Sequence, residues 1–152
     1  MRPKKERIIY APPKILVFKP AGIQGNRLEK IQMSIDEFEA IRLSDLFGDD
    51  HETAAKKMGI SRPTFSRLIE KARKKVADAL INCKELIIEG GSIHFKNNLF
   101  RCNACGLTIK ADISEETPDK CPECGNETFK NMAEHLGHGR CCKRRFGGRG
   151  KC

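Results

Sequence analysis

Several features that are common in proteins are scarce or missing from this chain of 152 residues. It has no tryptophan and a single tyrosine, Tyr10, so eight phenylalanines supply nearly all of its aromatic side chains. No stretch approaches the ~20 consecutive apolar residues that a membrane-spanning helix requires. The basic opening MRPKKERIIY is not followed by the apolar run of about 7–15 residues found in secretory signals. We therefore expect a cytoplasmic protein with no membrane partner.

The local patterns that accompany most enzyme active sites are missing as well. The sequence shows no nucleophile beside a base, no glycine-rich loop suited to cradle a phosphate and no pair of carboxylates placed for acid–base catalysis. No motif indicates a small-molecule substrate. We therefore expect a binding protein rather than an enzyme.

Acidic residues are outnumbered by basic ones, which gives the chain a formal net charge of +9 and a pI of about 9.3. Such an excess is typical of proteins that bind an anionic partner, nucleic acid above all. The length allows one ordinary domain or two small ones. Composition divides the chain into a basic N-terminal arm, a helical DNA-binding domain, a four-cysteine module and a basic Gly/Cys-rich tail, at residues 1–33, 34–91, 92–132 and 133–152.

Helix start signals recur between residues 34 and 83. Ser34 with Glu37 forms a capping box, Asp49 with Glu52 offers a second cap, and Ser61 precedes a proline in a third first turn. These signals predict helices at 34–47, 50–58 and 61–83.

The segments on either side of these helices favour extended structure. Prolines in the N-terminal arm predict an extended segment with one short edge strand. After the helices, LIIEGGSIHF predicts a hairpin turning at Gly90-Gly91, and LFRC, LTIKADI and ETFKNM are further strand candidates.

The stretch AAKKMGISRPTFSRL, residues 54–68, has the spacing of a helix-turn-helix. Ala55 is small enough for a close helix crossing, and Gly59 tolerates the positive φ of the turn. Ile60, Phe65 and Leu68 would then fill the core beneath the second helix. A plain helical hairpin that ends at Gly59 is the alternative, but five matched positions together with the cationic bias favour DNA binding.

Charges separate along this helical region. Residues 61–80 carry six cations against two acids, whereas residues 34–50 carry six acids against one cation. The second helix of the motif is therefore the one expected to enter the major groove and to contact phosphates. Its candidate DNA-binding residues are Ser61, Arg62, Ser66, Arg67, Lys71, Lys74 and Lys75, of which Arg62, Ser66 and Arg67 are the candidates for base contacts.

The motifs FKPAGI, SIDEFEAIRLSDLFGDDHETAAKKMGISRPTFSRLIEKARKKVADAL and IEGG resemble an uncharacterised bacterial and archaeal family of proposed DNA-binding proteins. Its helical core is similar to the promoter-reading fourth region of sigma-70-type sigma factors. The resemblance covers about Arg2 to Gly91 and implies a helix-turn-helix transcription factor whose reading positions fall on Ser61, Arg62, Ser66 and Arg67. The cysteine-rich last third of the chain is not part of that core.

Two cysteine pairs lie in the sequences CNACG and CPECG, spaced as C-x2-C-x15-C-x2-C. Each pair can reach one metal from a tight turn, so the four thiolates predict a closed tetrahedral site. Rubredoxin-type iron modules use the same ligands, but we favour zinc because nothing else indicates electron transfer. The segment is too small to fold without the metal. The ligands are Cys102, Cys105, Cys121 and Cys124.

The remaining histidines and cysteines give weaker signals. A second metal site could form from His135, His138, Cys141 and Cys142, although a flexible basic tail with oxidisable thiols is the favoured interpretation. Cys83 follows an apolar stripe of the third helix and is expected to be a small buried residue.

Together these patterns predict an α+β protein with a three-helix helix-turn-helix domain and a small zinc-ribbon-like β module. The predicted function is that of a sequence-specific, double-stranded-DNA-binding transcription regulator. A homodimer is consistent with it, because many such readers are dimers. The alternatives are an iron- or redox-responsive rubredoxin-like protein and an RNA-binding ribbon that stacks bases on Phe95, Phe100 and Phe129, residues we favour as core.

Overall fold

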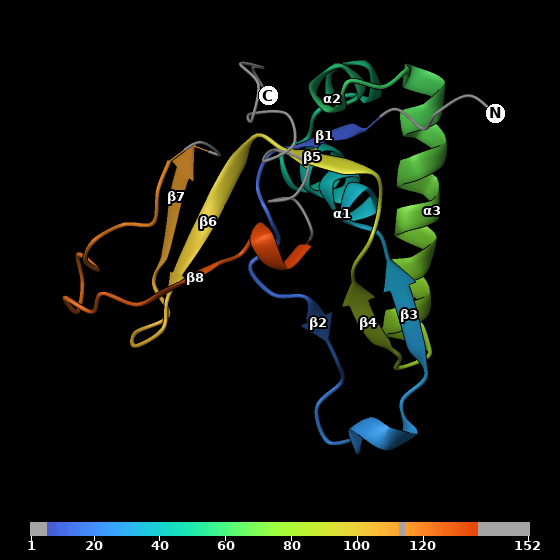
Figure 1. The fold of residues 1–152 in the computed structure, drawn as a ribbon. Coiled ribbons are helices and arrows are strands. Elements are labelled where there is room, and N and C mark those ends of the chain that lie inside the picture. Colours follow the sequence, from blue (N-terminus) through green and yellow to red (C-terminus); the bar gives the residue numbers. More distant parts are fainter. Residues whose placement is uncertain (1–5, 113–114, 137–152) are drawn as a thin grey trace. The chain divides into compact units, whose positions relative to one another are not determined.

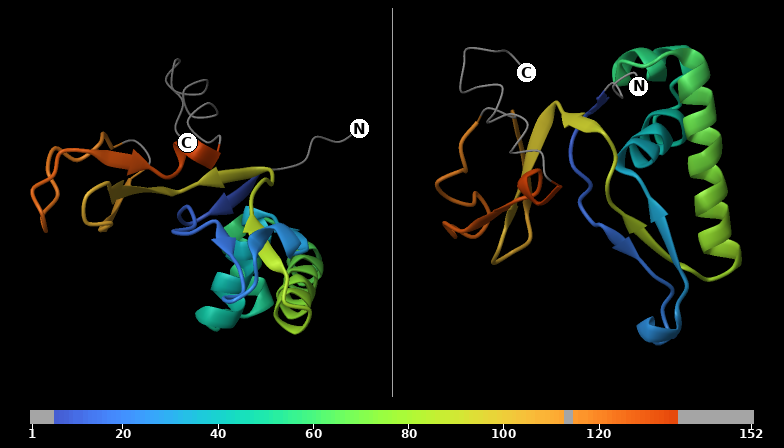
Figure 2. Two further views of the ribbon diagram at one scale, coloured as in Figure 1. Left: turned by 90° about the horizontal axis from the view of Figure 1, so that it is seen from below. Right: turned by 45° about the vertical axis from the view of Figure 1, so that its right-hand side comes forward.

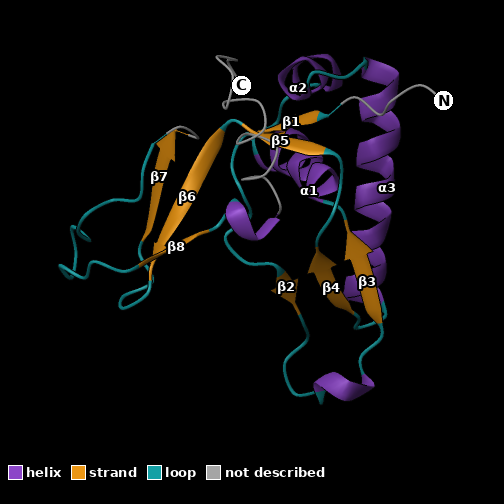
Figure 3. Cartoon of the chain, viewed as in Figure 1, coloured by secondary structure: helices purple, strands orange, loops and turns teal. Residues whose placement is uncertain are grey.

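The computed structural model describes residues 6–112 and 115–136, and the chain divides into two compact units (Figure 1). The first unit comprises Met1–Ile9 and Ile15–Ile93, and the second comprises Tyr10–Lys14 and His94–Cys152. Helices and small sheets both occur, which confirms the expected α+β class (Figure 3). Within the described ranges, no helix is at once long and apolar enough to cross a bilayer.

The helices of the first unit begin close to where the capping signals place them. α1 (Ile35–Ile41) continues into a π-helical turn, η2 (Arg42–Leu46), and is followed by α2 (His51–Met58) and the long α3 (Arg62–Ile81). The right-hand view of Figure 2 shows the length of α3 beside the shorter helices.

The caps of α1 and α3 are those predicted, whereas the cap of α2 is not. Ser34 and Glu37 form the predicted capping box, and the Ser61 side chain caps α3. Asp50, not Asp49, caps α2, because its Oδ1 accepts from the amides of Glu52 and Thr53 at 2.9 Å. Asp49 lies one residue too early and pairs with Lys57 instead.

A small apolar core lies between the three helices. Phe65 and Ile69 of α3 are fully buried, and so is Met58 of α2. Full burial of one such side chain stabilises the fold by roughly 1.5–3 kcal/mol. The other fully or nearly fully buried apolar residues of the three helices are Ile35, Ala40, Ala54, Ala55 and Ala72.

The N-terminal segment is not a separate arm, which corrects the prediction for it. β2 (Val17–Phe18) and β3 (Lys30–Met33) flank β4 (Glu85–Ile88) in a sheet of order β2-β4-β3, with η1 (Gly25–Arg27) between the first two. β2 pairs with β4 antiparallel and β3 pairs with it in parallel. The partner strand lies more than fifty residues further along the chain, so the local proline pattern gave no sign of this pairing.

The predicted hairpin at Gly90-Gly91 is also wrong, because β4 does not pair with β5 (Ile93–Phe95). The two glycines have φ values of 76° and 107°. The Gly90 carbonyl accepts from the Ile35 amide at 3.1 Å, and a Cβ on Gly91 would lie 3.0 Å from Asp36 Oδ1. The glycines thus let the chain pass close to the start of α1. Just before β5, the Ser92 carbonyl accepts from Arg7 of β1 (Arg7–Ile9) at 2.9 Å.

The second unit is built on an antiparallel sheet of order β7-β6-β8. Its strands are β6 (Asn97–Cys102), β7 (Thr108–Asp112) and β8 (Phe129–Asn131), followed by η3 (Glu134–Leu136). All three strand candidates of this region are confirmed. Phe95 and Phe100 are buried to 0% and 1% exposure, so neither ring is available to stack on a base.

Candidate nucleic-acid interface and metal centre

A three-residue connection joins α2 to α3. Gly59 ends α2 in the left-handed region at φ 67°, and the Ile60 amide then donates to the Ala55 carbonyl at 3.0 Å. Ser61 begins α3, its hydroxyl accepting from the Thr64 amide. A residue with a Cβ would be strained at Gly59, which is why this position requires glycine.

The burial of this region follows the spacing of the sequence. Ala55, Phe65 and Leu68 are 2%, 0% and 8% exposed, as expected for residues that hold two helices together. Ile60 is half-buried beside the turn. The opposite side of α3, including Arg62, is left to solvent.

Ser66 does not stand free on this outer side. It is half-buried, and its Oγ lies 2.9 Å from Nδ1 of His51 at the start of α2. The His51 ring also packs edge-on against Phe65, with 5.4 Å between ring centroids. Nothing in the sequence singled out His51, because its partner is fifteen residues away. Arg62 and Arg67 therefore remain as the exposed candidates for base contacts.

The acidic side chains of α1 and η2 face the cations of α3. Glu37, whose side chain is 2% exposed, lies 2.6 Å from Lys75 Nζ and 3.4 Å from Lys71 Nζ. Asp45 pairs with Arg73 at 2.6 Å. Part of the charge separation seen along the chain thus becomes pairing across the contact of α1 and η2 with α3.

Glu37 is the centre of this pairing. Its Oε2 also accepts from the Ser34 amide at 2.9 Å. Burial by itself would raise the pKa of Glu37, but the hydrogen bonds from Lys75 and Ser34 and the charges of Lys75 and Lys71 together lower it below the ordinary value. The carboxylate is therefore ionised at neutral pH and connects two helices.

Once these pairs are formed, α3 keeps a smaller set of available cations. Arg62, Arg67 and Lys74 form no ion pair with any residue that the structure describes. Arg67, Lys71 and Lys74 are exposed and follow one another at helical spacing, so they lie along one stripe of α3. Lys75, which was among the predicted DNA contacts, is half-buried against Glu37.

The four cysteines of the second unit converge on one point. The sulfur atoms of Cys102, Cys105, Cys121 and Cys124 all lie within 4.8 Å of one another. Cys102 and Cys124 are 3.5 Å apart, and Cys105 and Cys121 are 3.6 Å apart. Tetrahedral thiolate ligands about 2.3 Å from a zinc ion would be roughly 3.8 Å from each other. The donor set therefore fits a metal ion, as the spacing predicted.

The two cysteine pairs have the same backbone turn. The Gly106 amide donates to the Cys102 carbonyl at 3.0 Å, and the Gly125 amide donates to the Cys121 carbonyl at 2.9 Å. Both glycines have positive φ, 76° and 71°. Each turn brings its two sulfur atoms to the same side, and the strands β6 and β8 hold the two turns together.

Two of these thiols, those of Cys102 and Cys105, have pKa values shifted in opposite directions. The amide of Cys105, followed by that of Ala104, lowers the pKa of Cys102 to about 6. A hydrogen bond from the Leu107 amide lowers the pKa of Cys105. Burial and the neighbouring cysteines outweigh it and raise this pKa to about 12. The pKa is lowered at Cys102 and raised at Cys105, and a metal ion bound at the centre would favour the thiolate form of its ligands.

Asn126 links the two turns at this site. Its Nδ2 lies 3.7 Å from Cys102 Sγ in the other turn and also donates to the Thr128 carbonyl at 3.0 Å. The backbone carbonyl of Asn126 accepts a hydrogen bond from the backbone amide of Cys121 at 2.8 Å. Sequence reasoning did not select this residue, because its contact is with a sulfur atom twenty-four positions earlier.

Replacing Asn126 with leucine should weaken metal binding about tenfold, the lower end of what loss of an outer-shell hydrogen bond costs. Affinity for Zn²⁺ would be measured by competition with a chromophoric chelator. Asn103→Leu is the matched control, since Asn103 is exposed in the first turn and its backbone amide, which the substitution keeps, donates to the Thr128 carbonyl at 3.1 Å. Equal affinities of the two variants would contradict the role of Asn126.

Two weaker predictions concerned a second metal site near the C-terminus and the burial of Cys83. Of the candidate second metal site, His138, Cys141 and Cys142 lie outside the described residues, as does the side chain of His135. Cys83 is exposed, not buried as predicted. α3 ends at Ile81, and Cys83 takes a φ of 51°, which carries it off the apolar stripe.

Comparisons with known proteins place the first unit in a family. Residues 1–96 match the family model described as "Protein of unknown function DUF134". The chain belongs to this family. No solved structure matches it.

The DUF134 chain is also similar to curated bacterial relatives along most of its length. A "UPF0251 protein" of Chloroherpeton thalassium is 48% identical over 131 residues, 86% of each chain. Proteins of the same name from Moorella thermoacetica and Desulforudis audaxviator are 40% and 38% identical over 147 and 150 residues. They cover 96% and 99% of this chain, and the matches span 96% and 94% of their own lengths. The similarity therefore extends beyond the DUF134 segment into the cysteine-rich unit.

Proposed function

We propose that this protein is a sequence-specific DNA-binding regulator of transcription, in which α2 and α3 act as a helix-turn-helix. Three features support the proposal: the glycine turn at Gly59, the buried contacts of Ala55 and Phe65, and an exposed α3 that begins with Arg62. A helix presented in this way can enter the major groove with its N-terminal residues toward the bases.

The observation that carries the proposal is the selective pairing of cations on α3. Lys75 and Arg73 are engaged by acids of α1 and η2, whereas Arg62, Arg67 and Lys74 are not paired within the described residues. Glu37 and Asp45 therefore neutralise Lys75 and Arg73, and Glu37 also lies 3.4 Å from the exposed Lys71, while Arg62, Arg67 and Lys74 keep their charge for a phosphate backbone. Arg62 and Arg67 would contact bases, and Lys74 with Lys71 would contact phosphates.

The second unit is proposed to be a zinc-ribbon-like module with a structural role. Four thiolates suit zinc or iron equally. We favour zinc because no other motif of the sequence indicates electron transfer. A colourless protein with one equivalent of zinc is expected, and a red protein would instead identify an iron centre. Reduced cysteines of this kind fit a cytoplasmic location.

DNA binding is tested by fluorescence anisotropy on two duplexes, one selected from a random pool by the wild-type protein and one of unrelated sequence. Arg62→Ala and Arg67→Ala should each lose roughly 1–3 kcal/mol on the selected duplex alone. Lys74→Ala should weaken binding to both duplexes alike and reduce its dependence on salt.

Arg27→Ala is the matched control, because Arg27 is an exposed arginine of η1. It should bind both duplexes like the wild type. Indistinguishable behaviour of all four variants would reject the assignment of α3. Tighter binding to single-stranded RNA than to duplex DNA at the same salt would favour the RNA-binding alternative.

A further inference from the structure

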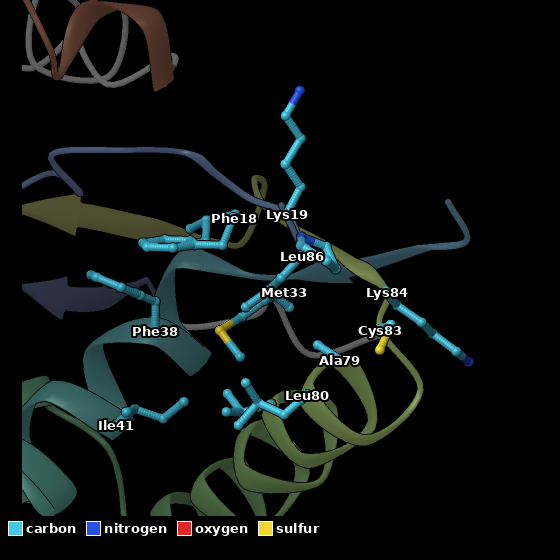
Figure 4. A pocket seen from close by; sticks show the side chains of 13 residues that line it. Phe18, Lys19, Met33, Phe38, Ile41, Ala79, Leu80, Cys83, Lys84 and Leu86 are labelled. Atoms are coloured by element: carbon cyan, nitrogen blue, oxygen red, sulfur yellow. The ribbon is translucent and has the colours of Figure 1, made fainter. Parts of the chain in front are cut away.

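The first unit has an apolar groove of about 470 Å³ between α1, the C-terminal half of α3 and the β2-β4-β3 sheet (Figure 4). A ligand in such a site is usually oriented by a few polar groups that point toward it. The two lysines at the rim, Lys19 and Lys84, direct their ammonium groups away from the groove, so neither would orient a ligand there (Figure 4). A surface of the second unit presents its charges more directly.

One face of the β7-β6-β8 sheet carries a cation from each of its three strands. Arg101 of β6 is directly opposite Lys130 of β8, and Lys110 of β7 is opposite Leu99, two residues along β6 from Arg101. Opposite residues of an antiparallel sheet share a face, and so do residues two apart on one strand. Lys110 and Lys130 are exposed and Arg101 is half-buried. We call these three residues the cationic row.

The cationic row is not neutralised within the protein. Its members form no ion pair with any residue that the structure describes, and the rest of the chain contains no aspartate or glutamate. Lys110 instead donates to the Tyr10 hydroxyl at 2.6 Å. Like charges directly opposite each other destabilise a sheet. The pair Arg101 and Lys130 therefore carries a cost to folding that a bound anion would remove.

The acids of this unit lie mostly away from the row. Asp112 is on the same face, but it is opposite Asn97, four residues along β6 from Arg101. In the connection between β7 and β8, Lys120 pairs with Glu127 at 3.5 Å. A surface that only needs to be soluble would intersperse the two signs, whereas here the strands keep their cations apart from an acidic connection. The acids of that connection are Glu115, Glu116, Asp119, Glu123 and Glu127.

The spacing of the row fits the repeating phosphates of a nucleic-acid backbone. Cβ atoms of opposite residues in a sheet are about 5 Å apart, and those of diagonal neighbours such as Arg101 and Lys110 about 7–8 Å. Three cations so spaced can each meet a different phosphate, because DNA carries a negative charge every ~3.4 Å along each strand.

The face lacks the side chains that reading of single-stranded RNA requires. Such reading depends on exposed aromatic rings that stack on bases. Phe129 precedes Lys130 in β8 and so points to the opposite face. The Tyr10 ring is occupied by Lys110, whose Nζ lies 5.0 Å from the ring centre. None of the strand residues of this face is aromatic; they are Asn97, Leu99, Arg101, Thr108, Lys110, Asp112 and Lys130.

We propose that the cationic row binds the phosphate backbone of the duplex that α3 reads, so that the second unit adds affinity without adding sequence preference. This inference rests on the proposed function of the first unit. The chain passes between the two units three times, so the second unit is tethered to any duplex that the first unit binds. Contacts made by a tethered module add to the affinity of the first contact.

The salt dependence of DNA affinity tests the row, measured by fluorescence anisotropy with the full-length chain loaded with Zn²⁺. Arg101→Gln and Lys130→Gln should each lower the slope of log affinity against log salt by about 0.9, the value for one phosphate contact. Each should weaken binding to the selected and the unrelated duplex by the same factor, because phosphate contacts carry no sequence information.

Lys120→Gln is the matched control, because it removes the same charge from an exposed lysine of the same unit that already pairs with Glu127. It should keep the wild-type slope. All three variants should keep the metal content of the wild type. Because Lys130 is exposed, Lys130→Gln decides the test if Arg101→Gln disturbs the metal site.

The outcomes separate this proposal from that for α3. A wild-type slope in Lys130→Gln, or an equal reduction in Lys120→Gln, would overturn the role of the row even if Arg62→Ala loses specificity as expected. Reduced slopes in the row variants, with Arg62→Ala and Arg67→Ala binding like the wild type, would reject α3 as the reading helix and keep the row as a DNA contact. A reduced slope on single-stranded RNA but not on duplex DNA would overturn the proposal in favour of an RNA surface.

Discussion

A strong chelator should unfold the second unit and leave the first unit folded. Four thiol groups lie within 4.8 Å of one another there, and Cys105 and Cys124, two of the four, are exposed. The sheet of this unit is short, and its apolar core is correspondingly small. Structural zinc contributes on the order of 10 kcal/mol or more to such small modules. Two-dimensional NMR would show the amides of β6, β7 and β8 collapse, while helical circular dichroism persists and Zn²⁺ restores the lost signals.

Cysteine variants separate this effect from general oxidation. Cys121→Ser removes a ligand that is 3% exposed and should reproduce the effect of the chelator. Cys83→Ser changes an exposed cysteine of the first unit and should leave metal content and folding unchanged. A second unit that stays folded without metal, or in Cys121→Ser, would show that the four sulfurs do not hold a structural ion.

Glu37→Gln should destabilise the first unit by about 3 kcal/mol, the lower end of the range for breaking a buried ion pair. The amide keeps the length of the side chain but loses the charge that holds Lys75 and Lys71. The cost stays at the lower end because both lysines can turn toward water. Urea unfolding monitored by helical circular dichroism measures the change. Glu52→Gln is the control, since Glu52 forms only an exposed pair with Lys56 on α2, and its effect should be small.

The same carboxylate makes stability dependent on pH. The pKa of Glu37 is lowered in the folded state, so the unfolded state binds a proton more readily. The stabilising contribution is present in full above the ordinary value of 4.5 and is lost as the pH falls through the lower folded pKa. The difference in unfolding free energy between wild type and Glu37→Gln should therefore shrink below about pH 4. A difference that stays constant to pH 2 would rule out this account.

Local chemistry was enough to predict the helices and the cysteine turns. Ser34, Glu37 and Ser61 act within three or four residues of their targets, so their capping roles could be read from spacing. The same holds for the paired cysteines, because a turn of four residues brings two sulfur atoms together wherever it occurs. Asp49 shows the limit of such arguments: Asp50 has the same side chain one position later and took the cap.

Pairings over long distances in the chain could not be predicted in this way. β4 pairs with strands that begin near residues 17 and 30, and glycines 90 and 91 serve close packing on Asp36 rather than a hairpin. The charge counts of residues 34–50 and 61–80 could be read from the sequence, but not which acids would meet which cations. Only the crossing of α1 and α3 brings Glu37 to Lys75 and Asp45 to Arg73.

The sequence by itself determined the elements whose interactions are local: three capped helices, a glycine turn at Gly59 and two cysteine turns. Tertiary structure alone decided which cations stay available and which apolar side chains stay uncovered, since both depend on segments that meet only after folding. Arg62 and Arg67 form no ion pair within the described residues, because the acids of α1 and η2 that contact α3 pair with Lys71, Arg73 and Lys75. Leu80 and Ile81 remain exposed because no described segment of the chain covers the end of that helix.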